Sequence, residues 1–370
     1  MGSIKEKIKY IRETKKLIRE AIIARGVDVP ENTTFRDYAN KIDEIPSGVD
    51  IGDYYDLTTK PNGGIRSYIT QIPMLDTSDC TSMRYMFEDC TRLTTIPQID
   101  TSKVINMDYM FDDCSSLTTI PQLDTSNVTN MMCMFYNCKL LTEIPHLDTS
   151  KVTNMNSMFW SCKSLTAIPQ LDTSKVTDMT NMLNGCSSLT SIPLLDTSNA
   201  TKMGGMFQFC TSLTSIPQLD TSNNTGMFTM FGNCKSLTTI PQLDTSKVTE
   251  MYGVFSECTS LTSIPQLNTS NVNSINNLFQ NCASLTTLGG LTNLGQAYST
   301  TQSANYYKYK LDLSMSINLT HDSLMNIINN LYDIATKGCN PQQLVLGETN
   351  LAKLTAEEIA IATNKGWSVS

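Results

Sequence analysis

The chain has little histidine, little tryptophan and no long apolar run. Its 370 residues include two histidines, His146 and His321, and two tryptophans. No stretch of 18 or more apolar residues occurs, so no segment is expected to insert into a membrane. The first residues carry charges throughout and lack an uninterrupted apolar core, so they do not look like a secretory signal.

The sequence also lacks the spacings that catalysis and metal binding require. It has no nucleophile elbow, no glycine-rich phosphate loop and no CxxC pair. An acidic cluster at Glu88, Asp89, Asp112 and Asp113 could supply the carboxylate pair of a glycan-cleaving solenoid. Charge on a solvated face is the ordinary explanation of such a cluster. We therefore expect no enzymatic activity, no cofactor and no metal site.

Charge is distributed unevenly along the chain. The formal net charge is −8, and residues 1–26 contain eight Lys or Arg and three Glu, a net +5, which leaves −13 on the remainder. An acidic body does not attract a phosphate backbone, so nucleic acid is not an expected partner. The glutamates that alternate with the basic residues predict a solvated helix face in this segment.

The chain is dominated by one repeated unit. Nine cysteines recur every 24 residues, from Cys90 to Cys282. A fixed period of this size indicates a solenoid, in which each unit contacts only its neighbours. We place nine units in residues 75–291, with residues 49–74 leading into them.

Each unit has two halves of different period. In the unit that starts at Cys114, Leu117, Ile120 and Leu123 are spaced by three among threonines and a proline, which predicts a short strand. Residues 128–135 follow helical spacing, which predicts one or two turns of an α-helix or of a tighter helix. Packed helices need about 8–10 Å and neighbouring strands about 4.8 Å, so the array should curve with its strands inside.

The unit LTTIPQLDTSxVTNMxxMFxxC resembles the BspA-like leucine-rich repeats of bacterial surface proteins, in the subclass with LDTSxVTxMxxMF. The resemblance covers well over half of the chain. It implies an α/β, leucine-rich-repeat-like solenoid of 24-residue units and a role in adhesion or recognition. The chain departs from these proteins in one respect: such surface proteins usually begin with an export signal, and the first residues of this chain do not look like one.

The two flanks are expected to close the solenoid. Residues 1–48 predict a helical cap or docking segment, in which the first helix ends at Gly26 and carries a stripe of isoleucines from Ile4 to Ile22 that permits copies to associate. Residues 292–370 predict strand–helix capping repeats. The predicted pieces are strands at 311–314, 344–346 and 367–369, a helix at 323–335, and a helix at 356–364 that opens with a capping box of Thr355 and Glu358.

Parts of both flanks resemble segments of tail-associated proteins of bacteriophages and prophages. These parts are residues 19–23, 29–35, 38–42, 354–360 and 362–367. The resemblance implies a virion location, with other virion proteins bound through the N-terminal helices and a bacterial surface glycan or protein as the target. A bacterial cell-surface adhesin whose export signal was removed is the alternative.

When the nine units are aligned, each set of equivalent positions forms a column. The columns whose residue hardly varies among the units have structural explanations. The methionine stripe is typical of a core rather than a copper or haem path. The cysteine ladder fits small buried residues with free thiols, since neither disulfide nor metal spacing is present, whereas Cys80, Cys133 and Cys339 lie outside it and are candidates for exposure. The aspartate column from Asp76 to Asp244 could be a calcium ladder, but Asn268 in the same column favours an Asx-turn or helix cap.

Four columns vary almost freely, two on each side of the Met-Phe pair in each unit. Seven of their 36 residues are aromatic, against 7% of the whole chain, and the others are mostly Asn, Ser, Gly and acidic residues. Aromatic anchors among small polar groups are typical of recognition surfaces. Drift of unconstrained positions, in a spacer without a ligand, is the alternative. The candidate ligand-binding residues are Tyr85, Tyr109, Tyr136, Trp160, Phe209, Phe228 and Tyr252.

Overall fold

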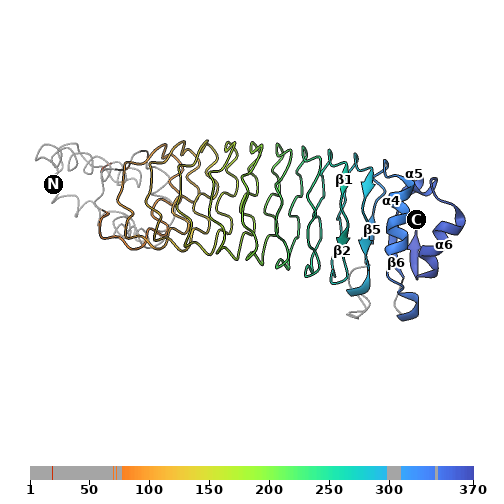
Figure 1. Ribbon diagram of the computed structural model, residues 1–370. Coiled ribbons are helices and arrows are strands. Elements are labelled where there is room, and N and C mark those ends of the chain that lie inside the picture. The colour runs from red at the N-terminus through yellow and green to blue at the C-terminus, as the bar shows by residue number, and fades with distance from the viewer. Residues whose placement is uncertain (1–18, 20–69, 71, 73–76, 298–309, 338–340) are drawn as a thin grey trace, which may run out of the picture.

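The computed structural model describes residues 19, 70, 72, 77–297, 310–337 and 341–370. The cap predicted at residues 1–48 and nearly all of the lead-in at 49–74 therefore lie outside the described residues. Figure 1 shows the described chain as a row of coils side by side, which runs from residue 77 into a group of strands and helices at the C-terminus.

Backbone hydrogen bonds join each coil to the next at a spacing of 24 residues. Parallel bridges pair Ser82 with Asn106, and the same column continues to the pairing of Glu250 with Ser274. On another side of the coil, the Thr118 amide donates to the Thr94 carbonyl at 3.0 Å. These bonds run along the stack, so the molecule is a solenoid.

Regular strands occur only in the last coils of the stack. β1 (Ser263–Ile264) pairs in parallel with β3 (Thr287–Leu288), and β2 (Leu267–Asn268) pairs in parallel with β4 (Leu291–Thr292). In the earlier coils the segment predicted as a strand is extended chain without regular strand pairing.

The prediction of a short helix in each unit is wrong. Between residues 77 and 294 the structure has no α-helix, and the segment from Met83 to Cys90 is a run of tight turns. The Met86 amide donates to the Met83 carbonyl at 3.2 Å, whereas the next amide, of Phe87, donates to Met110 in the following coil at 2.8 Å. Local bonds and coil-to-coil bonds therefore alternate along this side.

Two residues in each coil adopt left-handed backbone angles, which breaks the helix. In the first coil they are Tyr85 and Asp89, each with φ 61°. Because this side is also joined at hydrogen-bond spacing, it needs no more room per coil than the extended side. The predicted curvature had assumed helix-sized spacing on one side, and in Figure 1 the stack runs without a marked bend.

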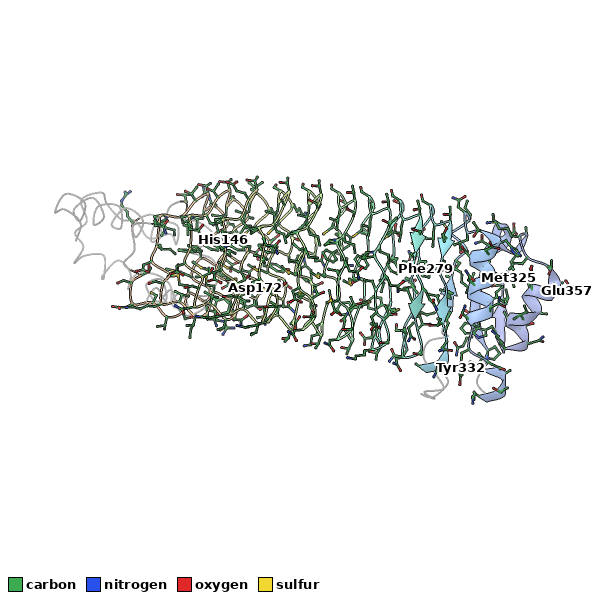
Figure 2. The ribbon with its side chains drawn as sticks, viewed as in Figure 1. His146, Asp172, Phe279, Met325, Tyr332 and Glu357 are labelled. Carbon is green, nitrogen blue, oxygen red and sulfur yellow. The ribbon has the colours of Figure 1, made fainter. Side chains whose placement is uncertain are left out.

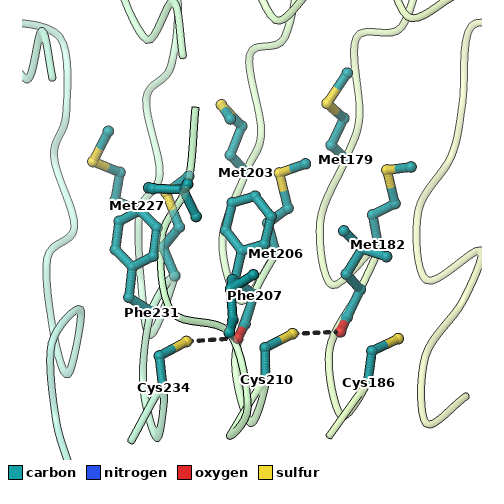
Figure 3. Close-up of a cluster of buried hydrophobic side chains, with 14 of the residues drawn as sticks. Met179, Met182, Cys186, Met203, Met206, Phe207, Cys210, Met227, Phe231 and Cys234 are labelled. Carbon is teal, nitrogen blue, oxygen red and sulfur yellow. Dashed lines mark hydrogen bonds between the residues drawn. The ribbon is translucent and has the colours of Figure 1, made fainter. Parts of the chain in front are cut away.

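The core is a set of stacked columns inside the coils. Phenylalanine rings stack along the axis with centroids 5.4–5.7 Å apart, from Phe87 to Phe159 and again from Phe207 to Phe279. Leu183 separates the two runs and is also fully buried. Figure 3 shows methionines packed beside these rings in neighbouring coils, as the core interpretation of the methionine stripe predicts.

The cysteine ladder is buried next to the phenylalanine column. The Cys210 thiol donates to the Leu183 carbonyl at 3.1 Å, and Cys234 donates to the Phe207 carbonyl at 3.0 Å (Figure 3). Burial raises the pKa of the Cys186 thiol to about 12. From Cys114 to Cys282 the ladder thus consists of thiols that donate to the preceding coil and whose pKa is raised by burial, and low reactivity follows from the raised pKa.

The C-terminal elements continue the stack in a larger strand–helix form. A parallel sheet in the order β5-β6-β7 joins β5 (Lys310–Asp312), β6 (Gln342–Val345) and β7 (Trp367–Val369). The helical pieces are α4 (His321–Asn330), the 3-10 turn η3 (Ala335–Lys337), α5 (Gly347–Leu351) and α6 (Ala356–Asn364). None of the described helices is long and apolar enough to cross a bilayer.

Side-chain caps fix the ends of these helices. Thr320 caps α4, which ends at Asn330, five residues before the predicted end. Thr355 and Glu358 form the reciprocal capping box of α6. α4 packs against β3, β4 and α6, so it couples the last coils to the C-terminal sheet.

We predict that the phenylalanine column tolerates leucine but not alanine. Phe159→Ala removes a fully buried ring and should lower the free energy of unfolding by about 3–5 kcal/mol. Phe159→Leu copies the natural Leu183 and should lower it by less than about 1.5 kcal/mol. Urea denaturation measures both variants. Equal losses would show that ring stacking does not organise the column.

We also predict a pH-dependent contact between α4 and α6. His321 Nε2 lies 2.9 Å from Glu358 Oε1, and Asp322 lies 3.6 Å from the same imidazole. The bond to Glu358 raises the pKa of His321 above 6.5, so this stabilisation is complete below pH 6.5 and is lost as the pH rises through the raised value. Hydrogen exchange in α6 should therefore accelerate with pH in excess of its intrinsic dependence. His321→Gln should remove that excess, and an excess that persists would contradict the prediction.

Candidate recognition surface

The four variable columns form one side of the solenoid, which we call the outer wall. In the first coil its residues are Arg84, Tyr85, Glu88 and Asp89, and each later coil contributes the equivalent positions, 24 residues on. The inward residues between them are the methionines and the phenylalanine or leucine of the core. The outer wall is held flat by the alternating coil-to-coil hydrogen bonds.

The backbone explains much of the composition that suggested adaptable contacts. Two of the four columns, those of Tyr85 and Asp89, have positive φ in every coil. Glycine adopts this conformation freely, and Asn and Asp adopt it more readily than other residues. The column of Asp89 accordingly contains Asp113, Asn137, Ser161, Gly185, Phe209, Asn233, Glu257 and Asn281. The abundance of small polar residues there follows from the backbone, without any need for a ligand.

The aromatic residues of the outer wall are spread along the stack, in the first four coils and again in the sixth to eighth. Six of the seven candidates form ring contacts in pairs between adjacent coils, of which the first two pairs are tilted and the third is stacked, and Phe209 lies one coil before the third pair. The pairs are Tyr85–Tyr109 with centroids 5.0 Å apart, Tyr136–Trp160 at 5.4 Å, and Phe228–Tyr252 at 6.0 Å. The structure therefore does not bring the candidates together into one site.

The candidates differ in how much they expose. Phe209 and Tyr252 have 46% and 43% of their surface exposed, and the other five are half-buried. The Phe228 ring lies directly over Gly204, where an added Cβ would come within 2.2 Å of the ring. Each paired ring is thus partly covered by its neighbour, and its remaining surface can contact a partner.

Not every position of the outer wall is accessible. Glu88, Asp108, Cys133, Ser157 and Asn184 are buried, although helical spacing predicted that all four columns point to solvent. The difference arises because consecutive coils lie close enough for a side chain to be covered by its neighbours.

The N-terminal end of the outer wall perturbs its titratable groups. Burial raises the pKa of Tyr109 to about 12 and of Cys133 to about 11. Burial also raises the pKa of the Asp108 carboxyl, against the opposing effects of the Asn106 amide and Arg84. The expected exposure of Cys133 is wrong, because the structure buries it, and its raised pKa argues against reactivity. Cys80 is half-buried, and Cys339 lies outside the described residues.

The constant columns on the other sides are explained by bonds that sequence reasoning missed. Gln98 Nε2 donates to the Gln122 carbonyl at 2.8 Å, and Thr125 Oγ1 donates to the Asp148 carbonyl at 2.9 Å, each in the next coil. Identical bonds recur along the stack. The sequence signal for these coil-to-coil bonds is a side chain that can donate a hydrogen bond and that recurs every 24 residues.

The aspartate column makes Asx-turns rather than a visible cation site. Asp124 Oδ1 accepts from the amide and hydroxyl of Ser126 at 3.0 and 2.7 Å, and Asn268 accepts equivalent bonds from Ser270. Hydrogen bonds from serine lower the pKa of these carboxyls, as at Asp124. Within the described residues, no group of three or more His, Cys, Asp or Glu is placed to hold a metal.

A second surface feature lies along the aspartate column. A shallow groove of about 660 Å³ is bordered by Asp172, Asp196 and Asp220, beside Leu194, which is 64% exposed.

His146, which replaces glutamine in an exposed column, lies on the coil stack well away from Glu357 of α6 (Figure 2). Neither feature assembles a nucleophile with a base.

Solved structures that are similar to this chain include three bacterial leucine-rich repeat proteins. The one from T. pallidum is 24% identical, with a TM-score of 0.30, over 40% of this chain and 67% of that one. The one from Bacteroides ovatus is 18% identical (TM-score 0.21; 65% and 77% covered), and the one from Eubacterium ventriosum is 16% identical (0.31; 60% and 74%). Such TM-scores carry no argument about this chain. Among curated proteins, none matches.

One protein family matches by sequence over most of the chain. Its pattern matches residues 63–167, 140–241 and 213–310, overlapping segments that together span the repeat region. The matches cover more than half of the 370 residues. The chain therefore belongs to the family described as Mycoplasma protein of unknown function, DUF285.

Proposed function

We propose that this protein is a non-enzymatic recognition protein that binds a bacterial surface protein or glycan through the aromatic groups of its outer wall. The scaffold presents the outer wall, the strand–helix region at 292–370 closes one end, and residues 1–48 attach the protein to its carrier. A bacteriophage or prophage tail is the proposed carrier, and a bacterial cell surface is the alternative.

The observation that carries the proposal is the placement of aromatic side chains where the backbone disfavours them. Tyr85, Tyr109 and Phe209 have φ between 56° and 61°. A residue with a Cβ in this conformation costs about 1–2 kcal/mol relative to an ordinary one. The scaffold does not require these rings, since Asn, Ser or Gly occupies the same positions in other coils. Retained strain of this kind is typical of functional surfaces.

A spacer without a ligand is the second candidate, and the pairing of the rings favours it. Each pair joins two adjacent coils, so the rings add to the cohesion of the stack. Aromatic pairs contribute about 0.5–1.5 kcal/mol beyond the area they bury. Phe209 separates the two candidates, because it is exposed, strained and not in one of the ring pairs.

We predict that removal of the seven aromatic side chains abolishes binding to target cells or glycans. The experiment compares the labelled wild type with a variant in which all seven become serine, on a panel of bacterial cells and purified surface glycans. A matched control changes seven exposed threonines of the opposite, extended side to serine. These are Thr94, Thr118, Thr142, Thr166, Thr190, Thr214 and Thr238.

The expected result is that the aromatic variant loses binding and the threonine variant keeps it. Phe209→Asn separates binding from stability, because asparagine suits a φ of 60°. It should leave the free energy of unfolding unchanged or raised, and it should weaken binding. Equal binding by the wild type and the aromatic variant would move recognition to another surface. No binding by the wild type to any member of the panel would support the spacer.

A further inference from the structure

The negative charge of the outer wall is concentrated in its first two coils. Of the four columns, these coils carry Glu88, Asp89, Asp108, Asp112 and Asp113, with Arg84 as the single cation. In the other seven coils the same columns contain one charged residue, Glu257. We call the first two coils of the outer wall the acidic end.

The charge at the acidic end is only partly balanced within the described residues. The Asp108 side chain is 5% exposed; its Oδ2 accepts from Asn130 Nδ2 at 2.9 Å and lies 3.9 Å from Arg84 Nε, and its Oδ1 has no hydrogen-bond partner. The Asp89 carboxylate forms no hydrogen bond or ion pair with a described residue. Lys103, on the same coils, is already paired with Asp79 at 2.8 Å. The acidic end therefore favours an additional cationic group.

The structure also shows how a cation fits on this surface. The Arg84 guanidinium lies 4.6 Å from the centre of the Tyr85 ring and donates to the Tyr85 hydroxyl at 2.8 Å. The Tyr109 ring contacts the Tyr85 ring in a tilted arrangement, with centroids 5.0 Å apart. Aromatic faces next to carboxylates are suited to arginine and lysine side chains.

The chain contains a segment of the complementary charge. Residues 1–26 carry a net +5, from eight Lys or Arg and three Glu, and no other stretch of comparable length is so basic. This segment precedes the first coil in the sequence, and the acidic end is formed by the first two coils. A contact within one chain benefits from a high effective concentration, so that weak exposed charge pairs suffice to hold it.

We propose that the basic segment of residues 1–26 docks on the acidic end of the outer wall of its own chain. The docked segment covers Tyr85 and Tyr109, so in that state recognition of an external partner falls to the Tyr136–Trp160 pair and the aromatic residues of the later coils, among which Phe209 is the strained ring. The proposal goes beyond the recognition function, and either can hold without the other.

Zero-length crosslinking of the full chain tests the location. A carbodiimide joins lysine amines directly to carboxylates that they contact. At low salt, crosslinks from Lys5, Lys7 and Lys9 should concentrate on residues 88–113 rather than on the carboxylates of the groove. Their yield should not change on dilution, because the contact lies within one chain. An even distribution over the acidic residues, or a yield that falls on dilution, would overturn the proposal.

Tryptic cleavage within residues 1–26 tests the dependence on charge. The variant Asp89→Asn, Asp112→Asn and Asp113→Asn should fold, because other coils have asparagine in two of these columns, as at Asn137 and Asn184. At low salt its segment should be cleaved about threefold faster or more than that of the wild type, and at high salt the two rates should converge.

The matched control is Asp172→Asn with Asp196→Asn, which removes two charges from the groove. Asn268 shows that asparagine keeps the Asx-turn in that column. The control should be cleaved at the wild-type rate. Equal acceleration in both variants would show a general charge effect, and no acceleration in the triple variant would show that the segment does not dock there. Either result would contradict the proposal.

Discussion

The structure depends on the hydrogen bonds that run along the stack from one coil to the next. On the outer wall every second amide makes such a bond, as Phe87 does to Met110 at 2.8 Å, and the amides between them close local turns. The fold can alternate in this way only if two residues per coil take positive φ. This constraint sets the spacing of the coils, the straightness of the stack and the residues that each column accepts.

The same constraint distinguishes residues that the fold requires from residues that the fold does not explain. Columns with a coil-to-coil side-chain bond, such as those of Gln98 and Thr125, are nearly constant because most copies repeat the same donor. The outer wall carries fewer such bonds, and its preferences come from the backbone. Residues that satisfy neither requirement, above all the aromatic ring of Phe209 at φ 60°, are the ones that recognition would explain. The recognition proposal therefore rests on strain that the scaffold leaves unexplained.

Sequence reasoning predicted the solenoid, the inward columns and the capping box at Thr355, because period and residue type report burial and local turns directly. It could not distinguish a helix from a run of turns on the outer wall. Both conformations place Met83, Met86, Phe87 and Cys90 inward, so their apolar spacing is the same. The recurrence of Asn, Gly and Asp in two columns carried the missing information, and it was attributed to a binding surface instead of to positive φ.

The most direct measurement of the account compares the stability of Ser161→Gly and Ser161→Ala by chemical denaturation. Ser161 has φ 57°, where glycine is unstrained and alanine is not. The account predicts that the glycine variant is more stable than the alanine variant by about 1 kcal/mol. In a helix the order reverses by about the same amount. A more stable alanine variant would contradict the left-handed turns on which the outer wall depends.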